Sequence, residues 1–572
     1  MEIIGTGTKA NTYDAIVVGS GISGGWAAKE LCEKGMKVIM LERGRDIKHV
    51  TDYTEATKNP WDFPHRGRVD SKTAEEYFIN VRTGYTANEP WRNMFENDKE
   101  NPIVEKKPID WIRGYHVGGR SLMWGRQSYR WNPTDFEANA KEGIATDWPV
   151  RYNDIAPWYD YVEKFAGISG GKDNLDVLPH GEHYLPAMNM NALEKEMKIR
   201  IEKEFPNRHF IMGRTAHLTG ESKIAYDLGR AQCQYRNRCM MGCPYGGYFS
   251  TQSSTLPAAV KTGNLTLRPD AIVQEVIFDD KLGKAVGVRI VDQKTNESIE
   301  YFAKVIFLNA SAFPTTGIMM NSKSKRHPNG LGNESDQLGR NIMDHHLAVG
   351  ASGEFDGMAD EYYYGRRANG IYIPRFRNWG TDKRDYTRGF GYQGSATRDD
   401  WGRGASQEGI GAEFKDSLSY PGQWRFGMMG FGEVLPNPDN RMYLDDKQKD
   451  KWGMPLFVFD AEYKENEKKM RVDMANDAKE MLEMAGLKNV KTNDRGSFLG
   501  MAIHEMGTAR MGRDPKTSVV NAHNQVHAVK NVFMTDGACM TSASCVNPSL
   551  TYMALTARAA DFAVKEVKKL SL

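Results

Sequence analysis

Three glycines near the start of the chain, Gly19, Gly21 and Gly24, follow a short apolar run and open a stretch with helical spacing. In such a turn the first glycine allows a tight bend, the second lets the backbone approach a pyrophosphate, and the third lets the helix pack closely. Glu42 lies 23 residues after Gly19 and closes the next apolar run, where a carboxylate accepts ribose hydroxyls and disfavours a 2′-phosphate. The pattern predicts a dinucleotide site, and spacing alone does not separate FAD from NAD.

A cluster of cysteines is the second group with the types and spacing for chemistry. Cys233, Cys239 and Cys243 fall within eleven residues and precede a proline. Three thiols in a glycine-rich loop are typical of iron–sulfur ligation, whereas a closed zinc site needs four ligands. The competing interpretation is a loop of small buried side chains without metal. Arg236 and Arg238 flank the thiols and suit either an anionic cluster or a surface loop.

The elements that must position these groups follow from hydrophobic patterning. Residues 13–18, 24–34 and 37–41 predict a strand, a helix and a strand around the glycine turn. Further patterns predict a hairpin over 271–291, buried strands over 305–308 and 532–535, and a C-terminal helix over about 548–569. Residues 45–110 are polar and charged, which predicts a solvated, loop-like excursion.

The residue composition changes between about 345 and 500, where aromatic residues and strand-like stretches become frequent. This change predicts an α/β protein with a Rossmann-type dinucleotide-binding domain and a second α+β substrate domain built on an antiparallel sheet. We expect the dinucleotide-binding domain to be discontinuous. Its predicted segments are 1–165, 226–344 and 500–572, and those of the substrate-binding domain are 166–225 and 345–499.

Composition narrows the class of partner. The chain has 572 residues, a formal net charge of +2 and 26% charged residues, so neither nucleic acid nor an anionic membrane is expected as the main partner. No apolar window is long enough to predict a membrane span. The N-terminal residues show no export signal. This favours a cytoplasmic protein, or a periplasmic one exported with a signal-bearing partner subunit.

Several motifs resemble the glucose–methanol–choline (GMC) oxidoreductase family in their order and spacing. Beyond the glycine turn and Glu42, they are residues 117–125 (VGGRSLMWG), 147–152 (DWPVRY), 330–345, 504–508 (HEMGT), 518–521, 536–537 and 547–551 (NPSLT). Within the family, the chain is most similar to the bacterial sugar-oxidising branch, the large subunits of gluconate, glucose, fructose and glucoside 3-dehydrogenases.

The resemblance implies FAD bound in an extended form. In relatives with covalent FAD, a histidine follows the second glycine of the pair by four residues, and here Met123 holds that position. A thioether is not expected to make that bond, and His116 lies on the other side of the pair, so we expect dissociable FAD. The implied cofactor-binding residues are Gly19, Ser20, Gly21, Ile22, Ser23, Gly24, Glu42, Arg43, Gly118, Gly119, Trp124, Val273, Ala310, Asp536, Gly537, Asn547, Pro548 and Ser549.

The resemblance also assigns a catalytic pair, His504 and Asn547. Oxidation of an alcohol needs a base for the hydroxyl proton and an acceptor for the hydride, and neutral histidine has a suitable pKa for the base. His504 would be the base, and the Asn547 amide would hold the substrate oxygen while the cofactor takes the hydride. The remaining histidines of interest are interpreted as structural: His345, His346, His523 and His527.

These expectations favour FAD-dependent oxidation of a secondary hydroxyl of a sugar or glycoside, with C3 as one candidate carbon. The electrons would pass to a small subunit, a cytochrome c or a quinone. Large subunits of this branch carry a three-iron cluster, but their pattern has two adjacent cysteines where Cys233 is followed by Gln234. The alternatives are an oxidase that uses O2 on an alcohol or sterol, a non-redox flavin-containing lyase, and a scaffold flavoprotein.

Overall fold

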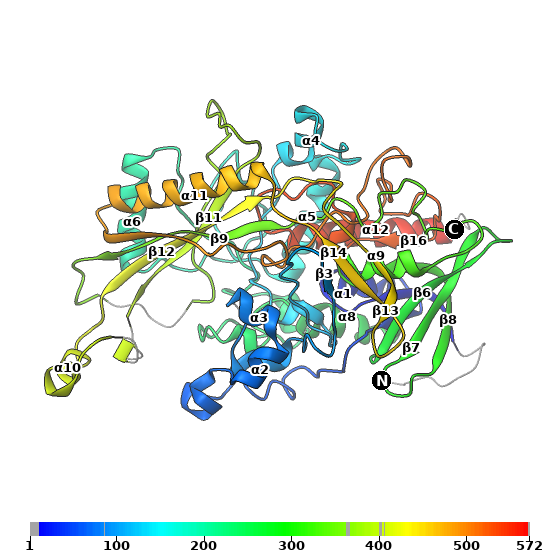
Figure 1. Ribbon diagram of the computed structural model, residues 1–572, viewed down its shortest axis with the longest axis horizontal. Helices are drawn as coiled ribbons and strands as arrows, with labels where there is room; N and C mark the ends of the chain where they lie inside the picture. Colours follow the sequence, from blue (N-terminus) through cyan, green and yellow to red (C-terminus); the bar gives the residue numbers. More distant parts are fainter. Residues whose placement is uncertain (1–10, 85, 362–366, 400–402, 405–406, 570–572) are drawn as a thin grey trace.

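The computed structural model describes residues 11–84, 86–361, 367–399, 403–404 and 407–569 (Figure 1). Two large sheets dominate it, one at each end of the view in Figure 1. In the described part of the chain, no helix is both long and apolar enough to cross a bilayer.

The first sheet carries the glycine turn and has the order β5-β2-β1-β8-β7-β6, with β16 also paired to β8. Its parallel strands are β1 (Thr12–Val18), β2 (Val38–Leu41), β5 (Leu265–Arg268), β8 (Ser298–Leu308) and β16 (Val532–Met534). The antiparallel strands β6 (Ala271–Asp279) and β7 (Lys284–Asp292) form a hairpin at one edge. Because parallel strands are buried on both faces, residues 15–18 of β1 and all of β2 are continuous apolar runs.

Helices cover this sheet and fix the glycine turn. α1 (Ile22–Glu33) connects β1 to β2 and packs against α12 (Ser549–Lys568) and α8 (Leu256–Lys261), while α12 also packs against α5 (Tyr152–Ala166). α9 (Ala312–Asn321) follows β8. The sheet and its helices are the Rossmann-type unit that the sequence predicts, and this fold class is confirmed.

The second sheet is antiparallel, with the order β15-β9-β12-β11-β10-β4. Its strands are β4 (Ile211–Met212), β9 (His345–Phe355), β10 (Ile371–Ile373), β11 (Phe390–Arg398), β12 (Trp424–Glu433) and β15 (Lys488–Asp494). The helices α6 (Ala192–Glu204) and α11 (Glu465–Met484) pack on it through leucine and methionine side chains, and Figure 1 shows α11 lying along the strands. All strands come from the segments expected in the substrate domain, and the domain boundaries themselves stay a prediction.

Smaller elements complete the fold. A three-stranded sheet contains β13 (Arg441–Lys449), β14 (Pro455–Asp460) and β3 (Val104–Glu105), and β13 contacts α9. The short helices are α2 (Ser71–Glu76), α3 (Phe78–Thr83), α4 (Ala138–Glu142), α7 (Lys223–Tyr226) and α10 (Gly411–Ser417).

The solvated excursion expected over residues 45–110 is wrong in part. The segment contains α2 and α3, and it buries Ile79, Met94 and Ile109. Its charged residues also turn inward, since buried Asp98 forms a 2.6 Å ion pair with buried Arg113. Polar composition predicted exposure because composition does not show that Asp98 is neutralised by Arg113 and buried with it.

Candidate active site

An elongated cavity runs from the glycine turn to the start of α12. Its empty volume, including the part that is open to solvent, is about 2090 Å³. His504 and Asn547 line it. All the cofactor residues implied by the resemblance also line it, except Gly24, Gly118 and Pro548. The fold therefore brings residues from both ends of the sequence to one cavity.

The three exceptions do not line the cavity, but each is next in the chain to a residue that does. A Cβ atom on Gly24 would lie 1.9 Å from the carbonyl oxygen of Gly19, so a side chain there is incompatible with the close approach of helix to turn. Gly118 has a left-handed φ of 93° and donates a 2.9 Å hydrogen bond to Oγ of Ser20. Pro548 is the residue before the first turn of α12.

Glu42 ties the glycine turn to the next strand. Its buried carboxylate accepts hydrogen bonds from the backbone N–H groups of Ser20 (3.0 Å) and Gly44 (2.9 Å), and one from the Ser20 hydroxyl. Burial raises the pKa of this carboxyl. Glu42 also lines the cavity, so it is placed both to hold the turn and to meet a ligand.

The features around the turn fit a dinucleotide. A Cβ atom on Gly21 would meet no atom within 4 Å, so the missing side chain opens the cavity wall at this point. Gly21 is also the residue before α1, whose N-terminus has no side-chain cap and leaves its N–H groups for an anion. The buried Nδ2 of Asn309 has no hydrogen-bond partner in the described residues, although Asn309 lines the cavity.

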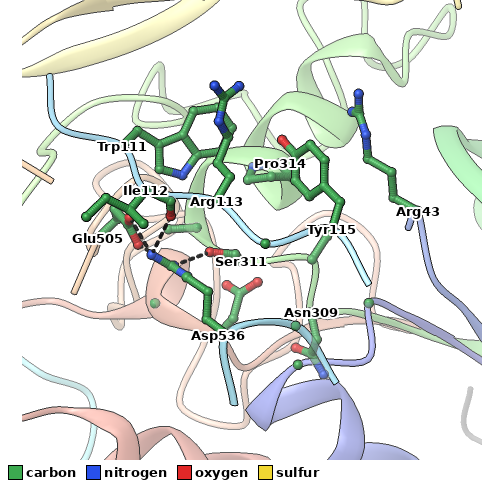
Figure 2. A pocket seen from close by; sticks show the side chains of 18 of the residues that line it. Arg43, Trp111, Ile112, Arg113, Tyr115, Asn309, Ser311, Pro314, Glu505 and Asp536 are labelled. Atoms are coloured by element: carbon green, nitrogen blue, oxygen red, sulfur yellow. Dashed lines mark hydrogen bonds and ion pairs between the residues drawn. The ribbon is translucent and has the colours of Figure 1, made fainter. Parts of the chain in front are cut away.

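Figure 2 shows the walls of the cavity. Trp111, Tyr115 and Pro314, which the sequence analysis missed, stand on one side, and Asp536, which the resemblance implies, lies across from them. Burial raises the pKa of the Asp536 carboxyl to about 6, and its Oδ2 accepts a 2.6 Å hydrogen bond from Thr315. The missed aromatic residues, Trp111 and Tyr115, directly follow the segment 45–110 that the sequence presented as a loop, and no local pattern marked them as cavity residues.

Arg120, which is half-buried, forms an ion pair with buried Glu505 beside the same cavity. Its Nη1 lies 2.7 Å from Oε1 of Glu505, and its Nη2 donates a 3.0 Å hydrogen bond to Oγ of Ser311. These partners appear with their dashed lines in Figure 2. Glu505 directly follows His504, so this ion pair holds the base segment against the glycine-pair loop.

His504 and Asn547 come together although they lie 43 residues apart. Nδ2 of Asn547 is 3.4 Å from Nε2 of His504. Burial lowers the pKa of His504 well below its ordinary value, and His345 and Arg120 lower it further. The imidazole is therefore neutral at physiological pH, which a proton acceptor requires.

His345, interpreted from the sequence as structural, is in direct contact with His504. The two Nδ1 atoms are 3.0 Å apart, and Nε2 of His345 lies 2.9 Å from the carbonyl oxygen of Ser544. A carbonyl only accepts, so His345 carries its proton on Nε2, and its Nδ1 is the acceptor because burial lowers its pKa to about 4. His504 must then carry its proton on Nδ1, which leaves an unprotonated Nε2 in the cavity.

The Asn547 amide agrees with this assignment. Its Oδ1 accepts a 2.8 Å hydrogen bond from Nε2 of Gln393, a residue of β11 in the antiparallel sheet. With Oδ1 occupied, the amide NH2 group faces Nε2 of His504, which is the acceptor deduced above. Gln393 is a second residue that the sequence analysis missed, since nothing in its local sequence marks it.

Asp344 fixes the backbone that carries His504. Its buried carboxylate accepts hydrogen bonds from the N–H groups of Gly500 (2.8 Å), Ala502 (3.1 Å) and His504 (3.1 Å). Burial raises the pKa of Asp344 to about 7. Ligand atoms of Asp344, His345 and His504 lie within 4.8 Å of one another, but backbone N–H groups already occupy the Asp344 oxygens, so we assign no metal here.

The three-cysteine loop lies beside the cavity. Met240, between Cys239 and Cys243, lines the cavity and packs in the same apolar cluster as Ile503. All three cysteines are free thiols, and Nε2 of His217 lies 3.7 Å from Sγ of Cys239. Within the described residues, the three Sγ atoms do not all approach within 4.8 Å, so they do not converge on a single ion.

The arginines that flank the thiols have other partners. Arg238 donates a 2.8 Å hydrogen bond to the carbonyl oxygen of Lys58, and Arg236 donates one to that of Ala56. These bonds pin the cysteine loop to residues 56–58. The sequence left two interpretations of these arginines open, neutralising an anionic cluster or lying in a surface loop. Their hydrogen bonds to backbone carbonyls fit the surface loop.

A Rossmann-type sheet, a dinucleotide cavity and a neutral histidine in its wall define an oxidoreductase fold of the flavoprotein kind. Family models described as GMC oxidoreductase match residues 13–347 and 436–556. The chain therefore belongs to the GMC oxidoreductase family, as the sequence resemblance predicts, and is an FAD-dependent oxidoreductase that acts on CH–OH groups.

Individual relatives extend along nearly the whole chain. A 2-methyl-1,2-propanediol dehydrogenase of Mycolicibacterium austroafricanum is 28% identical, covering 97% of this chain and 96% of its own length. The fructose dehydrogenase large subunit of Gluconobacter japonicus is 26% identical, covering 97% and 98%. Pyridoxine 4-oxidase from Mesorbium loti has a similar fold, with a TM-score of 0.60 and 16% identity over 96% of this chain and 98% of that one.

Proposed function

We propose that this protein oxidises a secondary hydroxyl group of a sugar or glycoside to the keto sugar, with C3 as one candidate carbon, and passes the electrons to a protein or quinone acceptor. The observation that carries the reaction type is the unprotonated Nε2 of His504, directed at Asn547 in the cavity wall. The substrate class is supported by similarity to a fructose dehydrogenase large subunit over nearly the full length.

The chain's own groups have distinct tasks in this proposal. His504 accepts the hydroxyl proton at Nε2, while His345 holds the proton of His504 on Nδ1. The amide NH2 of Asn547 donates a hydrogen bond to the substrate oxygen, which places the reacting C–H bond. Bound FAD would supply the hydride acceptor. Its phosphates would lie against Gly19–Gly24, with Glu42 at the adenosine ribose.

FAD is proposed to be dissociable. Met123 occupies the position of the attaching histidine in covalent relatives, is buried, and lines the cavity. Precipitation of the protein with acid should therefore release the flavin into the supernatant. Flavin that stays with the precipitate after denaturation would refute this part of the proposal.

The deciding experiment is an anaerobic absorbance titration of the purified protein with a panel of sugars and glycosides. Bleaching of the oxidised flavin bands by a glycoside, with fast recovery on adding an artificial acceptor and slow recovery in air, is the expected result. No bleaching by any sugar, with flavin bound, would refute the carbohydrate substrate. Fast recovery in air would instead favour an O2-using alcohol or sterol oxidase. Because the chain is similar to a diol dehydrogenase, small alcohols are added to the panel.

The cysteine loop is proposed to hold a three-iron iron–sulfur cluster, with a small subunit and a cytochrome c as partners in electron transfer. The spread of the three thiols suits a cluster, which divides its ligands among several irons, better than one ion. Met240 places the loop against the cavity wall. Iron and acid-labile sulfide in stoichiometric amounts after anaerobic purification are expected, and their absence would refute the cluster while leaving the alcohol oxidation intact.

A further inference from the structure

Two buried arginines, Arg126 and Arg230, have guanidinium groups without full partners. Their side chains belong to residues that are only 5% and 3% exposed. In the described part of the chain, Nε and Nη1 of Arg126 and Nη2 of Arg230 have no hydrogen-bond partner. The rest of the Arg230 guanidinium donates to the carbonyl oxygens of Gly246 (3.0 Å) and Ala166 (2.9 Å), which are neutral groups.

Both guanidiniums face the three-cysteine loop. Burial raises the pKa of the Cys233 and Cys239 thiols, and the nearby Arg126 charge opposes that rise. Arg230 donates a 3.0 Å hydrogen bond to the carbonyl oxygen of Gly246, three residues after Cys243. Cζ of Arg126 lies 5.2 Å from the ring centroid of Tyr248, whose hydroxyl donates to the carbonyl oxygen of Cys239 at 3.3 Å. Both cations therefore lie near the three-cysteine loop, Arg126 by Cys233 and Cys239 and Arg230 by the residues after Cys243.

Such an arrangement is unfavourable by itself. Removing a charge from water is costly unless an opposite charge or a set of hydrogen bonds compensates for it. The described residues give neither guanidinium a carboxylate partner. Arg236 and Arg238 lie in the same loop but are only half-buried, and both donate to backbone carbonyls.

We infer that Arg126 and Arg230 are the counter-charges of an anionic iron–sulfur cluster held by Cys233, Cys239 and Cys243. This rests on the cluster proposed above and assigns residues to its electrostatic environment. A cluster bound by three thiolates is anionic, and hydrogen bonds and charges around its sulfurs set its stability and potential. Arg126 also lines the cavity, which places this counter-charge between the cavity and the loop.

The test compares Arg126→Gln and Arg230→Gln with Arg236→Gln, an arginine of the same loop whose guanidinium has backbone partners. Each protein is purified anaerobically, or reconstituted with ferrous iron and sulfide, and the rate of iron loss to a chelator is measured together with the flavin content. We expect the first two substitutions to weaken iron retention by about 10- to 100-fold, as for other residues that support metal ligands. Arg236→Gln should retain iron as the wild type does, and Arg126→Lys should restore retention in part.

The second readout is the thermal stability of iron-free protein, which the same substitution should increase rather than decrease. In protein stripped of iron, Arg126→Gln should raise Tm, because it removes a buried charge that nothing else compensates. Iron retention unchanged in Arg126→Gln and Arg230→Gln, with iron present in the wild type, would overturn the counter-charge assignment alone. Absence of iron from the wild type would overturn the cluster proposal itself. Loss of flavin and of the folded state in Arg126→Gln, but not in Arg126→Lys, leaves the Arg230→Gln comparison to decide.

Discussion

Nε2 of Gln393 donates a 2.8 Å hydrogen bond to Oδ1 of Asn547. Gln393 belongs to the antiparallel sheet, whereas Asn547 lies two residues before α12, which packs against α1 of the Rossmann-type unit. One side-chain contact thus joins the two sheets at the proposed catalytic pair. It orients the amide so that its NH2 group faces Nε2 of His504.

Gln393→Ala should lower kcat/KM by about tenfold or more, which corresponds to about 1.4 kcal/mol of transition-state stabilisation. The reason is that the Asn547 amide loses the bond that fixes its orientation. Stopped-flow flavin reduction by the best substrate measures the effect. Ser395→Ala, two residues along the same strand, is the matched control, and an equal loss in both variants would point to disruption of the strand instead.

His504→Ala should slow anaerobic flavin reduction by about 10²- to 10⁴-fold, the usual contribution of a positioned general base. The flavin content should stay normal, because the His504 side chain has no bond to the glycine turn. Replacement of His183, an exposed histidine, serves as the control. A His504→Ala protein with full activity would remove the base assignment and support a scaffold role.

His345→Ala should slow flavin reduction by about tenfold or more, a smaller loss than in His504→Ala. Without its acceptor at 3.0 Å, His504 samples the tautomer with the proton on Nε2, which is inactive as a base. Because His345 acts through His504, the loss should fall on kcat more than on KM. A loss confined to KM would show instead that His345 contacts the substrate.

Two glycine substitutions separate folding from cofactor binding. Gly24→Ala should destabilise the protein, since its Cβ would lie 1.9 Å from the Gly19 carbonyl oxygen. Gly21→Ala should fold normally, because its Cβ meets no protein atom within 4 Å, but should bind FAD more weakly. Thermal unfolding of the flavin-free proteins and FAD titration measure the two effects. Equal FAD affinity in Gly21→Ala and wild type would contradict the placement of the phosphates.

The pH profile should follow the lowered pKa of His504. Burial, His345 and Arg120 all disfavour its charged form, so the base stays neutral as pH falls through 6.5, the ordinary histidine value. We therefore expect kcat/KM to hold level through pH 6.5 and to decline only at lower pH. Asp344, with its pKa raised to about 7, lies against the same segment. An acid limb near pH 7 that disappears in Asp344→Asn would assign the titration to Asp344.

Much of the nucleotide-binding half could be predicted from the sequence. The strand, glycine turn, helix and acidic residue of 13–42 are consecutive, so a local pattern specifies them, and the hairpin over 271–291 is equally local. His504 and Asn547 were found through a family resemblance, and their roles stay predictions. The inward-facing side chains of residues 45–110, such as Met94 and Asp98, were missed because polar composition does not show which side chains the fold buries or, as for Asp98 and Arg113, pairs.

By itself the sequence determined the α/β class, the dinucleotide turn and the family, because each depends on short-range patterns or on the order of motifs. The tertiary structure alone decided which nitrogen of His504 is free, since that depends on His345, 159 residues away, and on the carbonyl of Ser544. It also decided that Arg126 and Arg230 are buried with guanidinium N–H groups that have no partner among the described residues. Protonation and charge balance are set by neighbours in space, and burial makes each missing neighbour costly.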